Sequence, residues 1–263
     1  DLKEALTIST EIKTNKSRMD LANFVIKYGQ NIGAGNIIIP LAKTLGVAQN
    51  RRKPKIEAVF EMTDLDLDMV KLFTKDKLLE IWNTKEPFLP NLKYDLVFDL
   101  KSVKTICNTY ELQNFVTGFE IVNNILVIKT LSALAPGNTR LAARGRLFSE
   151  NEKPSYNVDF ALITDDFQKM ANWLGYNPDI IVPATYKNAQ FAMNISGTPN
   201  NIKFSPLKAV FDKINVEAEV SYLSEGRKTW SVIARTDNVI NFDNYVKALP
   251  DNYVNEDVQE KIL

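Results

Sequence analysis

The sequence predicts a mainly β protein: an antiparallel sheet of repeated strand units with a few short helices. Apolar and polar residues alternate over several stretches, which places one set on each face of a pleated sheet. Clusters of Gly, Asn and Pro separate these stretches, as tight turns require. The third observation is repetition, because a basic turn, an alternating strand and an Asp- or Asn-capped helix follow one another three times. About a dozen strands are expected.

The first unit is expected over residues 1–92 and contains a helical insertion. Its strands are predicted at residues 21–28, 35–39 and 56–62. A helix is expected over residues 66–82, where apolar side chains have roughly helical spacing. Gly33 and Gly35 lack the third glycine of a dinucleotide-binding loop and instead indicate a hairpin bulge.

The second and third units are expected over residues 93–180 and 181–250, with a polar tail at 251–263. We predict the strands of the second unit at residues 94–100, 125–130, 141–148 and 156–163. A helix over 165–174 should follow them and end at Gly175 in the left-handed conformation. Predicted strands of the third unit lie at 191–195, 207–211, 214–222 and 230–235, before a short helix at 243–249. All three units should form one continuous body.

The composition excludes several kinds of chemistry. The chain has no histidine, which removes Ser-His and Cys-His nucleophiles and most zinc sites. Its single cysteine, Cys107, has no cationic neighbour in sequence and is expected to be structural. Basic and acidic residues balance at 32 each, which argues against a nucleic-acid partner. No apolar stretch has the roughly 18 residues of a membrane-spanning helix. We expect no enzyme, metal or cofactor.

Two charged clusters each allow a functional and a purely structural interpretation. Asp64, Asp66 and Asp68 resemble the start of a calcium loop, but the chain lacks the glycine and glutamate that follow in such loops. We therefore expect these acids to cap a helix. Arg140, Arg144 and Arg146 could bind an anion, but a solvated sheet edge guarded against aggregation is the preferred interpretation.

The apolar faces of the predicted strands are the feature of the sequence that bears on function. An apolar sheet face is ordinarily core, packed against a second sheet or a helix. The alternative is a sheet that curls into an open trough whose apolar lining contacts lipid chains. The residues alone favour a packed core, with the open trough as the remaining alternative.

Three segments resemble proteins of the AsmA-like family. Residues 193–202, which read MNISGTPNNI, resemble the SGTPDALxL turn of that family. Residues 64–68, which read DLDLD, match its D-L-D-L-D-x-L segment. In the middle unit, residues 124–128, 144–147 and those from 154 onward match the family's succession of strands. The resemblance covers most of residues 12–250, in three copies of the same order.

The resemblance implies a repeated, curled β-sheet with an apolar groove that carries phospholipids towards the outer membrane of a bacterium. It also implies a periplasmic body held at the inner membrane by a segment outside this chain, with other envelope proteins as possible partners. The chain opens at Asp1 without an initiator Met, which indicates a mature or excised fragment. Because the chain shows no anchor, the resemblance implies an internal or C-terminal piece. The family supplies no catalytic residues.

We therefore predict phospholipid transport along a groove whose lining alternates with solvent-facing residues. Candidate lining residues are Phe24, Ile26, Phe60, Leu96, Phe98, Val158, Phe160, Met193, Val216 and Val220. The competing hypothesis is a closed β-sandwich that acts as a scaffold or binds an envelope protein or a glycan. A third, a hydrolase that uses two carboxylates, lacks an acid pair that stands out.

Overall fold

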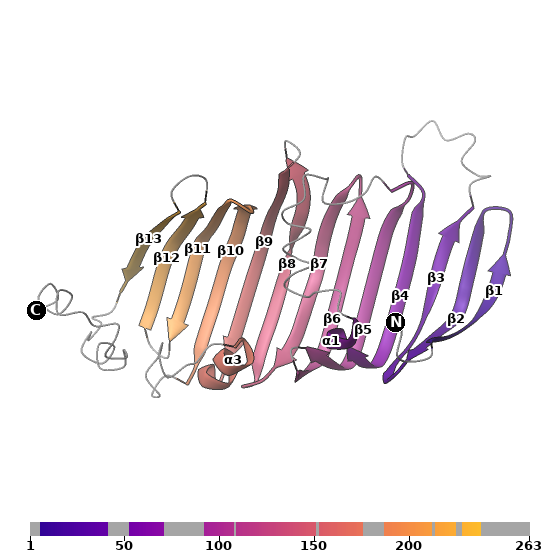
Figure 1. Cartoon of the computed structure of the whole chain (residues 1–263), viewed down its shortest axis with the longest axis horizontal. Coiled ribbons are helices and arrows are strands. Elements are labelled where there is room, and N and C mark those ends of the chain that lie inside the picture. The colour runs from indigo at the N-terminus through magenta and orange to yellow at the C-terminus, as the bar shows by residue number, and fades with distance from the viewer. Residues whose placement is uncertain are drawn as a thin grey trace, which may run out of the picture.

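The chain forms a single large sheet, as the computed structural model shows (Figure 1). The structure describes residues 6–41, 53–70, 92–107, 109–150, 153–175, 187–211, 214–224 and 228–237. Thirteen strands follow one another in the order β1 to β13, and the sheet does not close into a barrel. The mainly β prediction is confirmed.

Most strands are longer than predicted. Their bounds are β1 Leu6–Thr14, β2 Arg18–Tyr28, β3 Asn31–Pro40, β4 Lys55–Asp66, β5 Asp95–Cys107, β6 Tyr110–Val122, β7 Ile125–Ala135, β8 Thr139–Glu150, β9 Lys153–Thr164, β10 Ala189–Thr198, β11 Asn201–Phe211, β12 Ile214–Leu223 and β13 Thr229–Thr236. Two short helices are described, α1 (Leu67–Val70) and α3 (Phe167–Trp173). The expected helix at 243–249, the tail at 251–263 and most of the helix at 66–82 lie outside the described residues.

Neighbouring strands are antiparallel with one exception. Strands β4 and β5 run parallel, with Lys55 paired to Asp95 and Asp66 paired to Ile106. Expecting antiparallel pairing throughout was therefore wrong at this position. Parallel neighbours need a long connection rather than a hairpin, and residues 67–94 supply it.

Tight turns join most of the other strands, and several of them fall where clusters of Gly, Asn and Pro predicted them. Asn123 and Asn124 both adopt positive φ, at 51° and 64°, between β6 and β7. Asparagine tolerates this left-handed conformation better than most residues, and two such residues in succession match the twist of a hairpin. Gly29 adopts a φ of 58° at the turn between β2 and β3.

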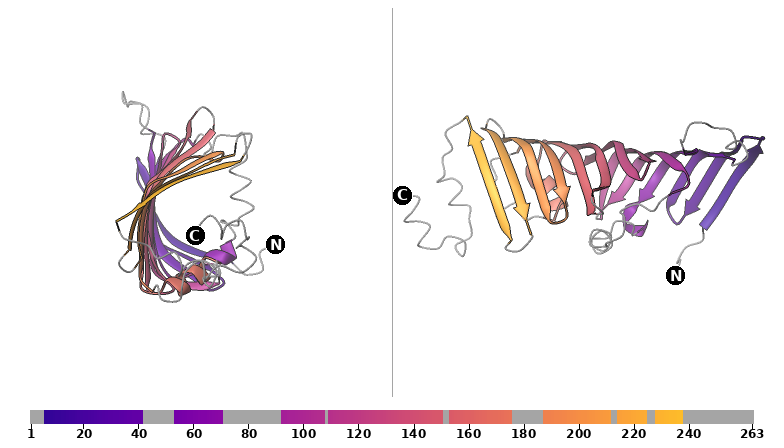
Figure 2. Two further views of the ribbon diagram at one scale, coloured as in Figure 1. Left: turned by 90° about the vertical axis from the view of Figure 1, so that its left-hand side faces the viewer. Right: turned by 90° about the horizontal axis from the view of Figure 1, so that it is seen from above.

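The sheet is twisted and curled, so that it has a concave and a convex face (Figure 2). Helix α3 lies on the concave side (Figure 2) and packs against Leu162, Phe191 and Phe211. All described strands belong to this one sheet, so the described residues contain no second sheet to form a sandwich. In the parts of the chain that the structure describes, no helix has the length and hydropathy to cross a bilayer.

Candidate functional site

An unbroken row of small and apolar residues crosses the concave face from β2 to β13. Residues that pair directly across neighbouring strands point to the same face of a sheet, so the register can be followed from strand to strand. The row consists of Phe24, Gly35, Phe60, Leu100, Thr117, Leu131, Ala143, Phe160, Met193, Leu207, Ala218 and Ala234. Thr117 is its one polar member. We call this set the apolar row.

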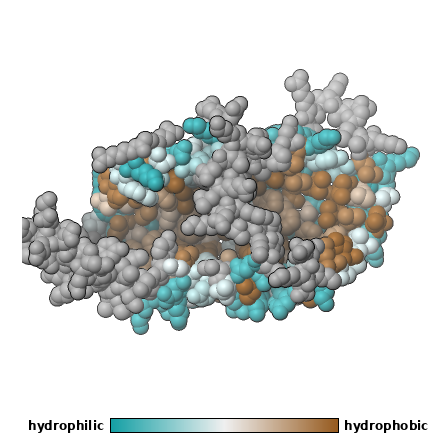
Figure 3. Space-filling model, viewed as in Figure 1, coloured by the Kyte–Doolittle hydropathy of each residue, from teal (hydrophilic) through white to brown (hydrophobic). Residues whose placement is uncertain are grey.

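The structure brings all ten candidate lining residues together on this face. Phe24, Phe60, Phe160 and Met193 belong to the apolar row itself. Five of the others lie one row to either side, namely Ile26, Phe98, Val158, Val216 and Val220, and Leu96 lies two rows away. Every one of the ten is half-buried, neither sealed nor fully exposed. Figure 3 shows apolar side chains lining the hollowed face of the molecule.

Four phenylalanines from non-adjacent parts of the sequence form an aromatic ladder along β2 to β6. The ring centroids of Phe24 and Phe60 lie 5.7 Å apart, and those of Phe60 and Phe98 lie 5.8 Å apart. Phe119 stacks on Phe98 at 4.9 Å. These distances are typical of favourable aromatic pairs. Sequence reasoning missed Phe119, because its strand β6 was not predicted.

Gly35 fits the ladder because it lacks a side chain. A Cβ atom there would lie 2.1 Å from the carbonyl oxygen of Val59 and 2.7 Å from the ring of Phe60. Gly33 and Gly35 both lie within strand β3, close to its hairpin with β2. An irregularity in the pairing of β3 with β4 does occur beside them, between Ile32 and Gly33.

Helix α3 covers the concave face over β8 to β11 and buries side chains there. Leu162, Met170 and Ala171 are only 4–5% exposed and form the centre of a buried cluster. Phe167 of α3 contacts Phe191 and Phe211 at centroid distances of 6.2 and 5.9 Å. Sequence analysis predicted the helix but not which part of the sheet it covers.

A hollow of about 420 Å³ lies between α3 and the sheet. We call it the α3 hollow. It is lined by Leu141, Phe160, Leu162, Phe167, Met170, Ala171, Trp173, Leu174, Phe191 and Met193. Of the candidate residues, only Phe160 and Met193 are among them.

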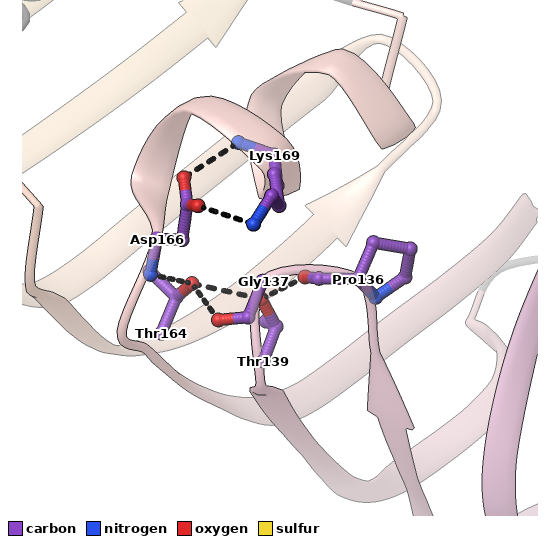
Figure 4. Close-up of polar contacts among 6 residues, drawn as sticks. All are labelled: Pro136, Gly137, Thr139, Thr164, Asp166 and Lys169. Carbon is purple, nitrogen blue, oxygen red and sulfur yellow. Dashed lines mark hydrogen bonds and ion pairs between the residues drawn. The ribbon is translucent and has the colours of Figure 1, made fainter.

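Hydrogen bonds fix the start of α3 to the sheet (Figure 4). Asp166 is the N-cap, and its carboxylate accepts a 3.0 Å hydrogen bond from the backbone N–H of Lys169. The Lys169 ammonium lies 3.0 Å from the same carboxylate. These interactions hold the pKa of Asp166 below its usual range, with the backbone hydrogen bond as the largest cause. Gly175, with a φ of 81°, follows the helix as predicted.

Two buried threonines complete this anchor. The Thr164 hydroxyl donates a 3.1 Å hydrogen bond to the carbonyl of Gly137 and accepts one of 3.2 Å from the backbone N–H of Asp166. Thr139 donates to the carbonyl of Pro136 at 2.6 Å. Thr139 and Thr164 are 0% and 1% exposed. Because buried hydroxyls need partners, these contacts set the position of α3 above the sheet.

The convex face carries exposed ion pairs together with scattered exposed apolar side chains such as Val25, Val59 and Ile163. Arg144 lies 3.3 Å from Asp159, and Lys208 lies 3.2 Å from Glu217. Hydrogen bonds from Asn194 and then Arg144 hold the pKa of Asp159 below its usual value. Exposed pairs of this kind contribute little stability, so this face is simply solvated.

The three clustered arginines do not mark a sheet edge as predicted. Arg140, Arg144 and Arg146 belong to β8, which is paired on both sides. All three arginines are exposed on the convex face, and the guanidinium of Arg146 lies 5.2 Å from the centre of the Phe148 ring.

The acidic segment leads into a helix, as expected, but only part of it lies at the helix N-terminus. Asp64 and Asp66 lie in strand β4, and only Asp68 stands in the first turn of α1. Asp68 accepts a 2.7 Å hydrogen bond from the backbone N–H of Thr109. Among the described residues, no group of three or more acids, cysteines or histidines could hold a metal ion.

Cys107 is the last residue of β5 and packs against the cluster of Leu112, Ala135 and Trp173. Burial, and secondarily the charge of Asp68, raise the pKa of the Cys107 thiol above its ordinary value. A raised pKa disfavours the thiolate that nucleophilic chemistry would need.

Comparison of the chain with family models, with curated proteins and with solved structures gave no match.

Proposed function

We propose that this protein binds the acyl chains of phospholipids along its concave face and conducts them within the bacterial envelope. The observation that carries the proposal is the apolar row, which runs through twelve strands and is flanked by half-buried apolar side chains. A large apolar surface that a protein leaves partly accessible usually marks a binding surface.

The mechanism is passive. Burying apolar surface stabilises a complex by about 25 cal/mol per Å², without any polar contact that fixes the ligand at one point. An acyl chain therefore keeps a similar free energy as it moves from strand to strand, while its headgroup stays in water beyond the strand ends. Weak selectivity for the headgroup follows from this arrangement.

On this proposal the protein acts in the periplasm, anchored to the inner membrane by a segment outside this chain. Other envelope proteins would deliver and receive the lipid, and neither a cofactor nor a nucleic acid takes part. The resemblance to the AsmA-like family supports this location.

The first test is organic extraction of the purified protein followed by lipid mass spectrometry. Phospholipid in near-stoichiometric amount is expected, above the level carried by a washed, unrelated β-protein. A lipid-free protein of normal stability that also fails to take up phospholipid from vesicles would overturn the proposal.

A pair of neighbouring substitutions in β12 localises the site. Val216→Asp places a charge on the concave face, whereas Asn215→Asp places the same charge on the exposed convex face. We expect Val216→Asp to reduce bound lipid severalfold, because an acyl chain would have to desolvate the carboxylate. Asn215→Asp should bind lipid like the parent, and circular dichroism of both variants should report the same β content. Phe98→Asp repeats the test at the aromatic ladder.

A further inference from the structure

We infer that the α3 hollow is a discrete site for the hydrocarbon tail of a lipid, at which a chain moving along the groove comes to rest. The inference depends on the proposed function and goes beyond it, because it assigns a specific position to the ligand. A uniform groove would have no such position.

The size of the hollow suits part of a lipid rather than a solvent molecule. Its volume of about 420 Å³ falls within the range of roughly 300–1,000 Å³ that small-molecule sites occupy.

The chemistry of the lining selects hydrocarbon. All ten lining side chains are apolar or aromatic, and the one nitrogen among them, Nε1 of Trp173, is itself buried. A peptide or sugar in the hollow would leave its N–H, C=O or hydroxyl groups without partners, at a cost of several kcal/mol for each group. Met170 and Met193 add flexible, polarisable side chains that adapt to an irregular ligand.

The hollow is open to the groove and to solvent, and its inner wall is closed. Phe160 and Met193 belong both to its lining and to the apolar row, so a chain on the row reaches the hollow without crossing polar surface. Leu162 and Met170 close the inner side and are each 4% exposed. Leu174, at 47% exposed, lies at the solvent side.

Trp173 provides a reporter within the hollow. The variant Trp82→Phe/Trp230→Phe leaves Trp173 as the only tryptophan of the full chain. Its fluorescence is measured with vesicles of phosphatidylcholine that carries bromine near the methyl end of one acyl chain, since bromine quenches indole on contact. A loss of Trp173 emission is expected, and a smaller loss when the bromine lies near the carboxyl end.

The control fills the hollow without adding charge. Ala171→Leu extends a side chain into it, and quenching of Trp173 should then largely disappear while lipid extracted from the rest of the groove is retained. Leu174→Phe enlarges a lining side chain from the helix side, outside the apolar row, and serves if Ala171→Leu lowers the melting temperature.

The outcomes separate the two proposals. If phospholipid is bound by mass spectrometry but Trp173 is not quenched by either brominated lipid, or if the filled variants quench as strongly as the parent, the α3 hollow is not the site. If no lipid is bound anywhere, the proposed function itself fails.

Discussion

Two stretches of the same concave face differ in how much water reaches them. From β2 to β6 the aromatic ladder of Phe24, Phe60, Phe98 and Phe119 is half-buried. From β8 to β11 the same alternation is covered by α3, and Leu162 falls to 4% exposed. The difference shows that alternation determines which side chains share a face, whereas packing against another element determines which of them become core.

The largest loss of stability should come from truncating a buried side chain in the stretch that α3 covers. Leu162→Ala removes a buried side chain and leaves a cavity, so the free energy of unfolding should fall by about 3 kcal/mol. Phe24→Ala in the half-buried ladder should cost clearly less, although it removes more atoms, because part of that side chain already contacts water. Urea unfolding followed by circular dichroism measures both. Equal losses would mean that the ladder is also core.

The strands that sequence analysis located are those with clean alternation, such as β9 and β12. Strand β6 was missed because Asn114 adopts a φ of 52° and irregular pairing near Gln113 interrupts its alternation. Such an irregularity shifts the pattern by one residue, which a test for strict period two does not recognise. β1 was missed for another reason, because only three of its nine residues, Leu6, Ile8 and Ile12, are apolar.

The face on which each candidate residue lies was predictable for the same reason, and the α3 hollow was not. Each candidate occupies an alternate position of one strand, so its face follows from local sequence. The hollow needs α3 to be placed on a particular part of the sheet, which depends on contacts such as Thr164 with Gly137 across 27 residues. The parallel pairing of β4 with β5 is also a tertiary property, although the length of the connecting segment 67–94 was a signal for it.

A glycine substitution tests whether the half-buried stretch is closely packed in its backbone. Gly35→Ala would place a Cβ atom 2.1 Å from the backbone oxygen of Val59, so β3 and β4 must separate. We expect a loss of about 2 kcal/mol in unfolding free energy. Gly118→Ala is the control, because the nearest atom to its Cβ, at 2.6 Å, belongs to the movable side chain of Asp99. Similar losses for the two variants would contradict close packing of the ladder's backbone.

The cap of α3 gives a smaller, pH-dependent effect confined to the covered stretch. Asp166→Ala should cost about 1 kcal/mol at neutral pH, the usual loss for an N-cap. Since the pKa of Asp166 is lowered in the folded protein, its charge contributes stability above the pKa of the unfolded chain. That contribution is lost as the pH falls through the lowered, folded-state pKa.

Asp166→Asn separates the two parts of this effect. Asparagine still caps a helix, so this variant should keep most of its stability at pH 7 but lose the acid-dependent part. Thermal unfolding from neutral to acidic pH measures the difference from the parent. A parent and a variant that lose stability in parallel would show that Asp166 contributes no charge effect.

The smallest effect concerns Cys107, which lies at the end of β5 and packs against the cluster that contains Trp173 of α3. Because its pKa is raised, chiefly by burial, the native thiol should react with iodoacetamide more slowly than the urea-unfolded chain at mildly alkaline pH. Asp68→Asn removes the second cause while keeping an oxygen that can accept from Thr109, so it should lower the pKa and speed the reaction slightly. An equal rate in native and unfolded protein would show that Cys107 is accessible, and that the cluster around Trp173 does not seal this end of the α3-covered stretch. Since the unfolded thiol ionises first, the same burial predicts that stability declines as the pH rises above the ordinary cysteine pKa.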